Sequence, residues 1–447
     1  MPTDGCTIPI SPDTTPARQA GRLPRLTGSE WALLLVLATV QFTHVLDFVI
    51  MMPLGPKLQG DLHISPEEFP DKFSSIVSAY GFSAGIMGLL AARLLDRFDR
   101  KKSLLVLFLG FAAGTLLCAV APNYVVLLVG RAVAGGFAGV MGANVLTIVS
   151  DVFPESRRAT AMGVVMSSFS VASIVGIYVG LEIAEHFGWR APFTILALLC
   201  LPVLLLAWYV LPPLRRHLVR RPARGVGLAE VILNPRHLRA YALSSSLIMG
   251  SWMIIPTLAI YLVKNLHWPE AELRWVWLVG GVATLLTMTP TGWLSDSRDK
   301  LTVFRVIGLL SVIPVLLVTN LPETSMPVIL LVTTLFMVVT SIRWVPVMAM
   351  ITTSAVPHQR GTFMSVNASV QQLAMGLASK ISGLLLVEQM VVGADGISAP
   401  KLVGYPLVGL LAAASMIAAV FLAGRLRRAP VVAVHGTPEM VAEPVIL

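Results

Sequence analysis

Long apolar segments recur along the whole chain and constrain its fold more than any other feature. The hydrocarbon core of a bilayer is about 30 Å thick, so a helix that crosses it needs about 20 apolar residues. Only 13% of the 447 residues are charged, against about a quarter in soluble domains. We therefore predict an all-α membrane protein with twelve transmembrane helices, at 31–54, 72–94, 103–121, 124–149, 160–184, 191–211, 241–263, 273–294, 303–320, 326–350, 363–387 and 402–424.

Lysine and arginine are distributed unevenly between the two sides that these spans define. Of the 33 bases, 24 lie on the side of the N-terminus, 6 lie on the opposite side and 3 lie within spans. Cytoplasmic loops carry an excess of Lys and Arg, so we expect both termini in the cytoplasm and the protein in the inner membrane of the cell. This distribution also accounts for the net charge of +9, and no nucleic-acid partner is expected. The first 28 residues lack an apolar core, so no cleavable signal peptide is predicted.

A basic linker divides the predicted spans into two sets of six. It carries seven arginines and one acidic residue, Glu230. The predicted organisation is an N-terminal tail at 1–30, a six-helix bundle at 31–211, the linker at 212–240, a second six-helix bundle at 241–424 and a C-terminal tail at 425–447.

An internal repeat supports this division. The loop after the second span reads Leu94-Leu95-Asp96-Arg97-Phe98-Asp99-Arg100, and the loop after the eighth reads Leu294-Ser295-Asp296-Ser297-Arg298-Asp299-Lys300. A leucine, two aspartates and a base recur at an offset of 200 positions. The repeat predicts two equivalent bundles that rock about a shared cleft, with a substrate near the middle of the membrane.

The repeated loops resemble a motif of the major facilitator superfamily of secondary transporters, G-x-L-a-D-r-x-G-r-r. Both copies have Asp in place of the later Gly, and the first copy also lacks the initial Gly. Residues 131–136, Arg-Ala-Val-Ala-Gly-Gly, resemble the motif R-x-x-q-G of the fourth span. The resemblance extends from end to end of the chain and implies alternating access to a central site.

Two further segments resemble bacterial twelve-span exporters of the drug:proton and sugar-efflux types. They are Val45–Leu54 in the first span and residues 176–190, which end in Gly-Trp-Arg. This resemblance implies a monomeric, proton-coupled exporter of small organic solutes or drugs. An importer or exchanger of organic anions and a non-transporting sensor remain as alternatives. No phosphate-binding loop is found, and the cysteines have no metal-ligand spacing. We therefore expect no enzyme activity, no cofactor and no metal.

The repeated loops also supply the candidate conformational gate. In the resembled family this cluster closes the cytoplasmic side in one of two alternating states. The alternative is that its charges only fix the topology. The candidate gate residues are Asp96, Arg97, Arg100, Asp296 and Arg298.

Four charged residues lie inside predicted spans, where a charge costs about 2.5–3.5 kcal/mol to insert. Asp47 and Arg131 are expected about 24 Å and 10 Å from opposite faces of the membrane, at about 1.5 Å per helical residue. An ion pair or a water-bridged contact between them is therefore possible, and motion between two states could switch the affinity of Asp47 for a proton. A permanent structural salt bridge is the alternative. Arg343 and Lys380 are the other two interior charges.

Polar residues within the spans give the candidate substrate cavity. Gln41, His44, Asp47 and Phe48 share one face of the first span at i, i+3, i+6 and i+7. His44 is expected as a cavity residue rather than a metal ligand, because no second ligand is spaced with it. Three interior bases against one acid favour a neutral or anionic substrate, although Arg343 and Lys380 could instead be structural. The candidate cavity residues are Gln41, His44, Arg343, Trp344, Asn367, Gln371 and Lys380.

Overall fold

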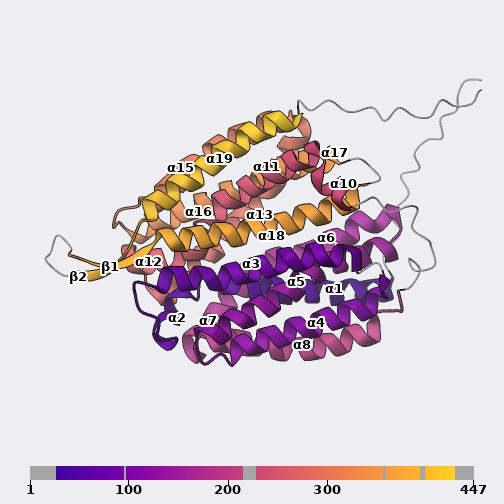
Figure 1. The fold of residues 1–447 in the computed structure, drawn as a ribbon, viewed down its shortest axis with the longest axis horizontal. Coiled ribbons are helices and arrows are strands. Elements are labelled where there is room, and N and C mark those ends of the chain that lie inside the picture. The colour runs from indigo at the N-terminus through magenta and orange to yellow at the C-terminus, as the bar shows by residue number, and fades with distance from the viewer. Residues whose placement is uncertain (1–26, 95–96, 215–227, 356–358, 393–397, 428–447) are drawn as a thin grey trace, which may run out of the picture.

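The computed structural model describes residues 27–94, 97–214, 228–355, 359–392 and 398–427, and it is almost entirely helical (Figure 1). The first half of the chain forms α1 (Gly28–Ile50), α2 (Gly55–Asp61), α3 (Phe69–Leu94), α4 (Arg100–Ala119), α5 (Tyr124–Val152), α6 (Glu155–Val171), the π-helical turn η2 (Ala172–Gly176), α7 (Ile177–Phe187) and α8 (Arg190–Val210). The second half forms α10 (Leu228–Leu233), α11 (Pro235–Trp252), η3 (Ile255–Thr257), α12 (Leu258–Leu266), η4 (Glu270–Glu272), α13 (Leu273–Ser297), α14 (Lys300–Leu310), α15 (Val312–Thr319), α16 (Met326–Ile342), α17 (Trp344–Ser354), α18 (Arg360–Leu385), β1 (Val387–Val392), β2 (Ser398–Val403) and α19 (Tyr405–Arg427).

Ten helical segments of the described chain are long and apolar enough to cross a membrane, some of them joined across short interruptions. The spans predicted at 273–294 and 363–387 correspond to α13 and α18, which are helical but are not among these ten. Both are less apolar, and α18 in particular carries Ser365, Ser369, Gln371, Gln372 and Lys380. Both predicted helices are therefore present, although they are less apolar than the other spans.

Prolines set where three helices of the second half are interrupted. The helices α11, α14 and α16 end at Trp252, Leu310 and Ile342, each four residues before a proline at 256, 314 or 346. A proline ring removes one backbone donor and clashes with the carbonyl group four residues earlier. These three prolines account for the interruptions, whereas Pro202 and Pro290 lie within the uninterrupted helices α8 and α13.

The aspartates that replace glycine in the repeated loops begin the next helix in each half. The side chain of Asp99 accepts a hydrogen bond from the backbone N–H of Lys101 at 3.0 Å, at the start of α4. The side chain of Asp299 accepts one from the N–H of Thr302 at 3.1 Å, at the start of α14. Asp is among the preferred N-cap residues because it satisfies a backbone donor that has no partner within the helix.

The two halves lie side by side, with α1–α8 in the lower part of Figure 1 and α10–α19 in the upper part. The helices α3 and α18 run together along the boundary. Glycines allow this close approach: a Cβ atom added at Gly81 would lie 3.0 Å from the carbonyl oxygen of Gln372, and one at Gly376 would lie 3.1 Å from that of Ser78. Small residues have this role at many helix contacts in membranes.

The bundle has two ends that differ in structure. The termini end contains the start of α1 and the end of α19, and the hairpin end contains α2 and a hairpin of β1 and β2 (Figure 1). The two strands pair antiparallel, from Val387 opposite Val403 to Val392 opposite Ser398. The hairpin was not predicted, and β2 includes Leu402 and Val403, which the predicted span 402–424 had placed in a helix.

Candidate functional site

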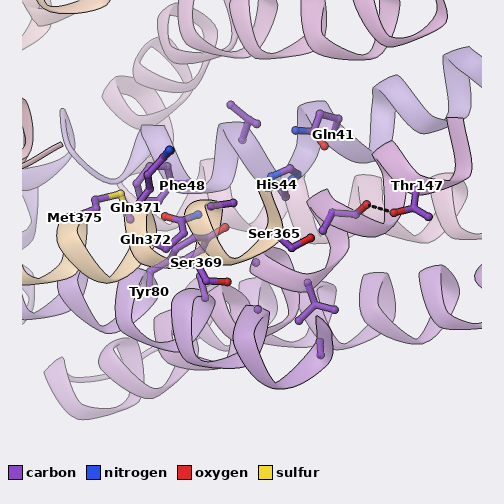
Figure 2. A pocket seen from close by; sticks show the side chains of 18 of the residues that line it. Gln41, His44, Phe48, Tyr80, Thr147, Ser365, Ser369, Gln371, Gln372 and Met375 are labelled. Atoms are coloured by element: carbon purple, nitrogen blue, oxygen red, sulfur yellow. Dashed lines mark hydrogen bonds between the residues drawn. The ribbon is translucent and has the colours of Figure 1, made fainter. Parts of the chain in front are cut away.

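A cavity of about 620 Å³ lies between the two halves, within the range of about 300–1,000 Å³ typical of small-molecule sites. Arg100 and Thr362 line it where α4 and α18 begin, so it extends toward the termini end. Trp252, the last residue of α11, lines its inner part. Figure 2 shows the side chains from α1, α3, α5 and α18 that border this space: Gln41, His44, Phe48, Tyr80, Thr147, Ser365, Ser369, Gln371, Gln372 and Met375.

The lining of this cavity combines polar and apolar side chains and carries little charge. Arg100 is the one Lys, Arg, Asp or Glu residue among the described lining residues. The side-chain oxygens of Gln41 and Tyr80 are buried, and the described structure gives them no hydrogen-bond partner. Buried polar atoms are normally paired, and these two are unsatisfied groups of residues that line the cavity. The cavity is therefore suited to hydrogen bonding beside aromatic surfaces.

Three of the predicted cavity residues, Gln41, His44 and Gln371, line the cavity. Asn367 and Trp344 do not. The side chain of Asn367 accepts a hydrogen bond from the Ser244 hydroxyl at 2.6 Å, and Trp344 packs against an apolar cluster of the second half.

The predicted cavity bases Arg343 and Lys380 also lie outside the lining. Arg343 is fully buried and donates to the carbonyl oxygens of Leu247 at 2.9 Å and Thr340 at 3.2 Å. Lys380 forms an ion pair with Asp71 near the hairpin end. The excess of interior positive charge inferred from the sequence is therefore not an excess of charge in the cavity, because these bases have partners on other helices or on backbone carbonyls.

Asp47 also turns away from the cavity, although its neighbours on α1 line it. Its carboxylate lies 2.7 Å from Nη1 of Arg131 on α5, and both residues are fully buried. The same nitrogen donates to the backbone carbonyl of Asp47 at 3.1 Å, and the Thr115 hydroxyl donates to the carboxylate at 3.1 Å. The structure thus brings Asp47 and Arg131 into direct contact, and α1, α4 and α5 meet at this pair.

Tyr80 lies between this ion pair and the cavity. The guanidinium carbon of Arg131 is 4.4 Å from the centre of the Tyr80 ring, a distance at which a cation is attracted to an aromatic face. Phe48 lies 4.9 Å from the Tyr80 ring and 5.2 Å from the Trp252 ring, between centroids. An aromatic row therefore runs along the cavity wall and ends on Arg131.

Tyr80 and Thr115 belong to the site but were not predicted as members of it. A signal existed, because a buried charge pair requires further polar partners. Both residues are polar side chains within predicted spans.

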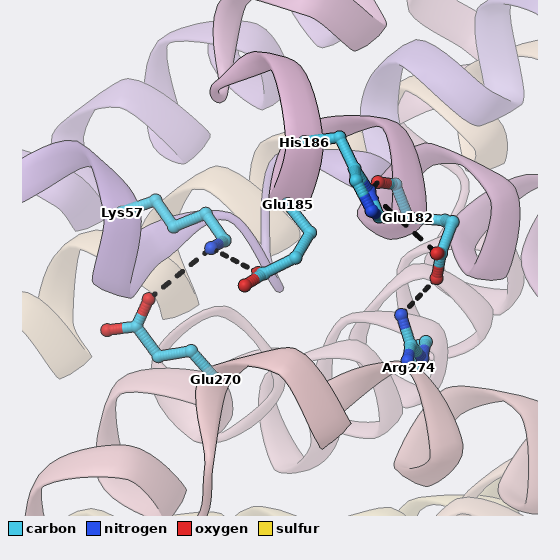
Figure 3. A network of polar contacts seen from close by, with 6 residues as sticks. All are labelled: Lys57, Glu182, Glu185, His186, Glu270 and Arg274. Atoms are coloured by element: carbon cyan, nitrogen blue, oxygen red, sulfur yellow. Dashed lines mark hydrogen bonds and ion pairs between the residues drawn. The ribbon is translucent and has the colours of Figure 1, made fainter.

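Charged residues close the hairpin end of the bundle between the two halves (Figure 3). The amine of Lys57 on α2 lies 2.6 Å from a carboxylate oxygen of Glu185 and 3.6 Å from one of Glu270, which belongs to the second half. Glu182 on α7 forms an ion pair with Arg274 on α13. These contacts join α2 and α7 to the second half.

A second group of contacts closes the same end beside the hairpin. The amide of Gln59 on α2 donates to the carboxylate of Glu388 on β1 at 3.1 Å, and Lys264 on α12 contacts both residues. The Ser78 hydroxyl on α3 donates to the carbonyl oxygen of Gly376 on α18 at 2.8 Å. The hairpin is therefore part of the closure.

At the termini end, the ion pairs found among the described residues join residues of the same half. Arg157 pairs with Glu30 at 2.8 Å, and Arg100 pairs with Asp151 at 3.6 Å. With the hairpin end closed and the cavity extending toward the termini end, this conformation is open toward the termini end.

The structure describes four of the five predicted gate residues. Arg97, Asp296 and Arg298 are exposed, and Arg100 lines the cavity. Asp96 lies outside the described residues.

Two helical halves around a central cavity that is closed at one end define a multi-pass membrane transporter. The model of the Major Facilitator Superfamily matches residues 37–379 and 240–441. The chain belongs to this superfamily.

Several proteins of known sequence are similar to the chain. The uncharacterized MFS-type transporter YceJ of Bacillus subtilis is 25% identical over 355 residues, which cover 78% of this chain and 87% of that protein. The gallate transporter of Pseudomonas putida is 28% identical over 45% of this chain and 44% of its own length. The rubrofusarin-specific efflux pump aurT of Gibberella zeae is 31% identical over 37% of this chain and 29% of its own length. The matched segments thus span less than half of the two relatives with named substrates.

Solved structures share the fold at low sequence identity. A bacterial homolog of the human lysosomal transporter Spinster, in an inward-facing and unoccupied conformation, has a TM-score of 0.64 and 15% identity over 90% of this chain and 96% of that one. The D-xylose–proton symporter has a TM-score of 0.70 and 16% identity over 88% and 97%. The human organic anion transporter MFSD10 has a TM-score of 0.60 and 17% identity over 88% and 99%.

Proposed function

We propose that the chain is a proton-coupled exporter of small organic solutes that works by alternating access in the inner membrane. The observation that carries this proposal is the buried Asp47–Arg131 pair, which lies directly behind the wall of the central cavity. A titratable carboxylate in that place can respond to the bound molecule and to the packing of α1 against α5. The resemblance of residues 45–54 and 176–190 to exporters supports the direction of transport.

The proposed topology has twelve spans, with both termini in the cytoplasm. The helices α13 and α18 contain 25 and 26 residues, and at about 1.5 Å per residue each is long enough to cross the bilayer. Polar side chains on α18 face the cavity, and a helix that lines a cavity need not be apolar on every side. The excess of Lys and Arg on the side of the N-terminus supports the orientation.

In this orientation the described conformation is inward-facing. The bundles at 31–211 and 241–424 would rock about the cavity, so that the contacts at the hairpin end separate and the termini end closes. We propose that Asp96, Arg97 and Arg100, with Asp296 and Arg298, form the closed cytoplasmic gate in that second state. The protein would act as a monomer, because one chain supplies the whole cavity.

The proposed coupling depends on the charge of Asp47. When Asp47 binds a proton, it loses the ion pair with Arg131, and the guanidinium then keeps its contact with the Asp47 carbonyl oxygen and with the Tyr80 ring. Because these contacts join α1, α3 and α5, protonation would change how α1 packs in the first half. A bound molecule that touches Tyr80 would act on the same contacts from the cavity.

The proposed substrate is a neutral or anionic compound with an aromatic part. Hydrogen-bonding groups and the row of Trp252, Phe48 and Tyr80 favour such a molecule. The relatives named as a gallate transporter and a rubrofusarin-specific efflux pump make gallate a reasonable first probe. Arg100 in the lining also supports a second candidate function, the import or exchange of organic anions.

Transport into proteoliposomes under an imposed pH gradient tests the proposal and separates the two candidates. A proton antiporter accumulates gallate when the vesicle interior is acidic, because outward proton flow drives inward substrate flow. A proton-coupled importer accumulates it when the interior is alkaline. A flux that is independent of both gradients would contradict proton coupling.

A further inference from the structure

A second cavity, of about 220 Å³, lies beside the first one between the two halves. It is bordered by η2 and α7 of the first half and by α13 and α16 of the second half. Phe169 and Trp252 line both cavities, so the two spaces share an aromatic wall.

The lining of the second cavity is mainly apolar. Its described residues include no charged side chain. One of its hydroxyl groups, that of Thr340, already donates to the carbonyl oxygen of Phe336 at 2.6 Å. Its apolar lining includes Phe169, Ile174, Trp252 and the methionines Met52, Met288 and Met337.

The shape of this cavity depends on local features of η2 and α13. Residue Ile174 of the π-helical turn faces Gly281, where an added Cβ atom would lie 2.7 Å from the Ile174 side chain. π-helical turns are rare and occur often at functional sites. Three methionines in the lining are flexible and polarizable, so the walls can adapt to apolar groups of different shapes.

The volume sets the size of group that fits. An apolar cavity of about 150 Å³ in a protein core stays dry and binds benzene. The second cavity is larger, at about 220 Å³, so it has room for a substituted ring or a short alkyl chain. The first cavity provides the hydrogen-bonding groups that this space lacks.

We propose that the substrate is an amphiphile whose polar head binds in the first cavity and whose apolar group binds in the second. The molecule would pass between Phe169 and Trp252, which border both spaces. This inference rests on the proposed function, in which the first cavity is the substrate site. It adds the second cavity as the part of the site that selects the apolar group.

Binding of a homologous series of esters tests this inference. The probes are radiolabelled n-alkyl 4-hydroxybenzoates, from methyl to hexyl, with the purified full-length protein in lipid nanodiscs and protein-free nanodiscs as the background. Each buried methylene is expected to raise the affinity by about fourfold until the cavity is filled. Thr284 on α13 also lines the second cavity, so Thr284→Phe places a ring there and should reduce this increase to less than twofold per methylene. Leu286→Phe is the matched control, because Leu286 is on the same helix, is 69% exposed and does not line the cavity.

Met337→Ala provides a second variant that enlarges the cavity. In this variant, the affinity should continue to rise for esters that are one or two methylenes longer than the limit found for the parent. Equal chain-length dependence in the parent and Thr284→Phe, as expected if a lipid chain fills the cavity, would overturn the inference. An unchanged limit in Met337→Ala, or no binding of any ester by the parent, would also overturn it. Proton-driven transport of gallate is measured separately, so failure of the proposed function is distinguishable from failure of the amphiphile site.

Discussion

The buried charged residues Asp47, Arg131 and Arg343 are compensated in different ways. The carboxylate of Asp47 accepts from Arg131 and Thr115, and Arg131 also contacts the Tyr80 ring. Arg343 is compensated instead by carbonyl and hydroxyl oxygens. Arg131 is thus paired with a titratable carboxylate beside the cavity, whereas Arg343 is not.

Tyr80 should contribute to binding through its hydroxyl and to the ion pair through its ring. Tyr80→Phe retains the ring and should weaken gallate binding by about 2- to 12-fold, the range of one net hydrogen bond, with little change in thermal stability. Tyr80→Leu removes the ring as well and should also lower the unfolding temperature. Equal binding by the parent and Tyr80→Phe would show that the hydroxyl does not contact the bound molecule.

Replacing both Asp47 and Arg131 by apolar residues should preserve the stability of the protein but not its proton-coupled transport. Arg131→Met leaves a buried carboxylate without its base, which typically costs about 3–5 kcal/mol. The double variant Asp47→Leu with Arg131→Met removes both charges and should regain most of that loss, since apolar replacements of buried pairs are often neutral. Denaturant unfolding measures the stability of each variant, and gradient-driven transport measures whether coupling is retained. A double variant that transports like the parent would show that the pair has no part in coupling.

At the scale of elements, local sequence rules decide where helices begin and end. Prolines at 256, 314 and 346 interrupt three helices four residues earlier, and Asp99 and Asp299 begin two others. The prolines and the capping aspartates are visible in the sequence. The hairpin of β1 and β2 was not predicted, because a short segment beside a predicted span carries only a weak strand signal.

The capping aspartates lead to a prediction that compares two small replacements. Asp99→Ala and Asp99→Gly both lose the hydrogen bond from the Leu214 N–H, but Asp99→Gly should be the less destabilising by about 0.5–1.5 kcal/mol because Gly is tolerated at an N-cap. The same order is expected for Asp299. Unfolding in lipid nanodiscs measures both pairs. Equal losses for Gly and Ala would mean that the cap does not explain why Asp stands where the family motif has Gly.

At the scale of the whole molecule, contacts at the hairpin end hold the described conformation. They are partly exposed ion pairs, and each such pair contributes about 0.2–1 kcal/mol. Arg274→Gln should therefore shift the balance toward the state that is open at the hairpin end by about 1.4- to 5-fold. Distances between spin labels at the two ends measure this shift. Glu68→Gln is the matched control, because Glu68 pairs with Lys72 in the same half. A shift of the same size in both variants would contradict a role for the contacts between the halves.

Much of the architecture could be predicted from the sequence, and less of the site. Apolar segments and the repeat at an offset of 200 predicted helices at the right places. Polar residues within spans predicted Gln41, His44 and Gln371 in the cavity lining. The places of Arg343 and Lys380 could not be predicted, because their partners lie on other helices; Asp71 is 309 positions from Lys380. Helical spacing placed Phe48 on the cavity face of the first span, but Tyr80 and Trp252 lie on other helices, so their contacts with Phe48 could not be predicted.

Gradient-driven accumulation of gallate by Asp47→Asn tests whether Asp47 carries the proton. Asn has nearly the same size and can still form hydrogen bonds, but it does not titrate. The account predicts that the variant folds, binds gallate and exchanges it across the membrane, yet loses accumulation driven by a pH gradient. Asp61→Asn is the matched control, because Asp61 also pairs with an arginine, Arg190, at 3.0 Å but lies at the hairpin end. Full proton-driven accumulation by Asp47→Asn would contradict the account.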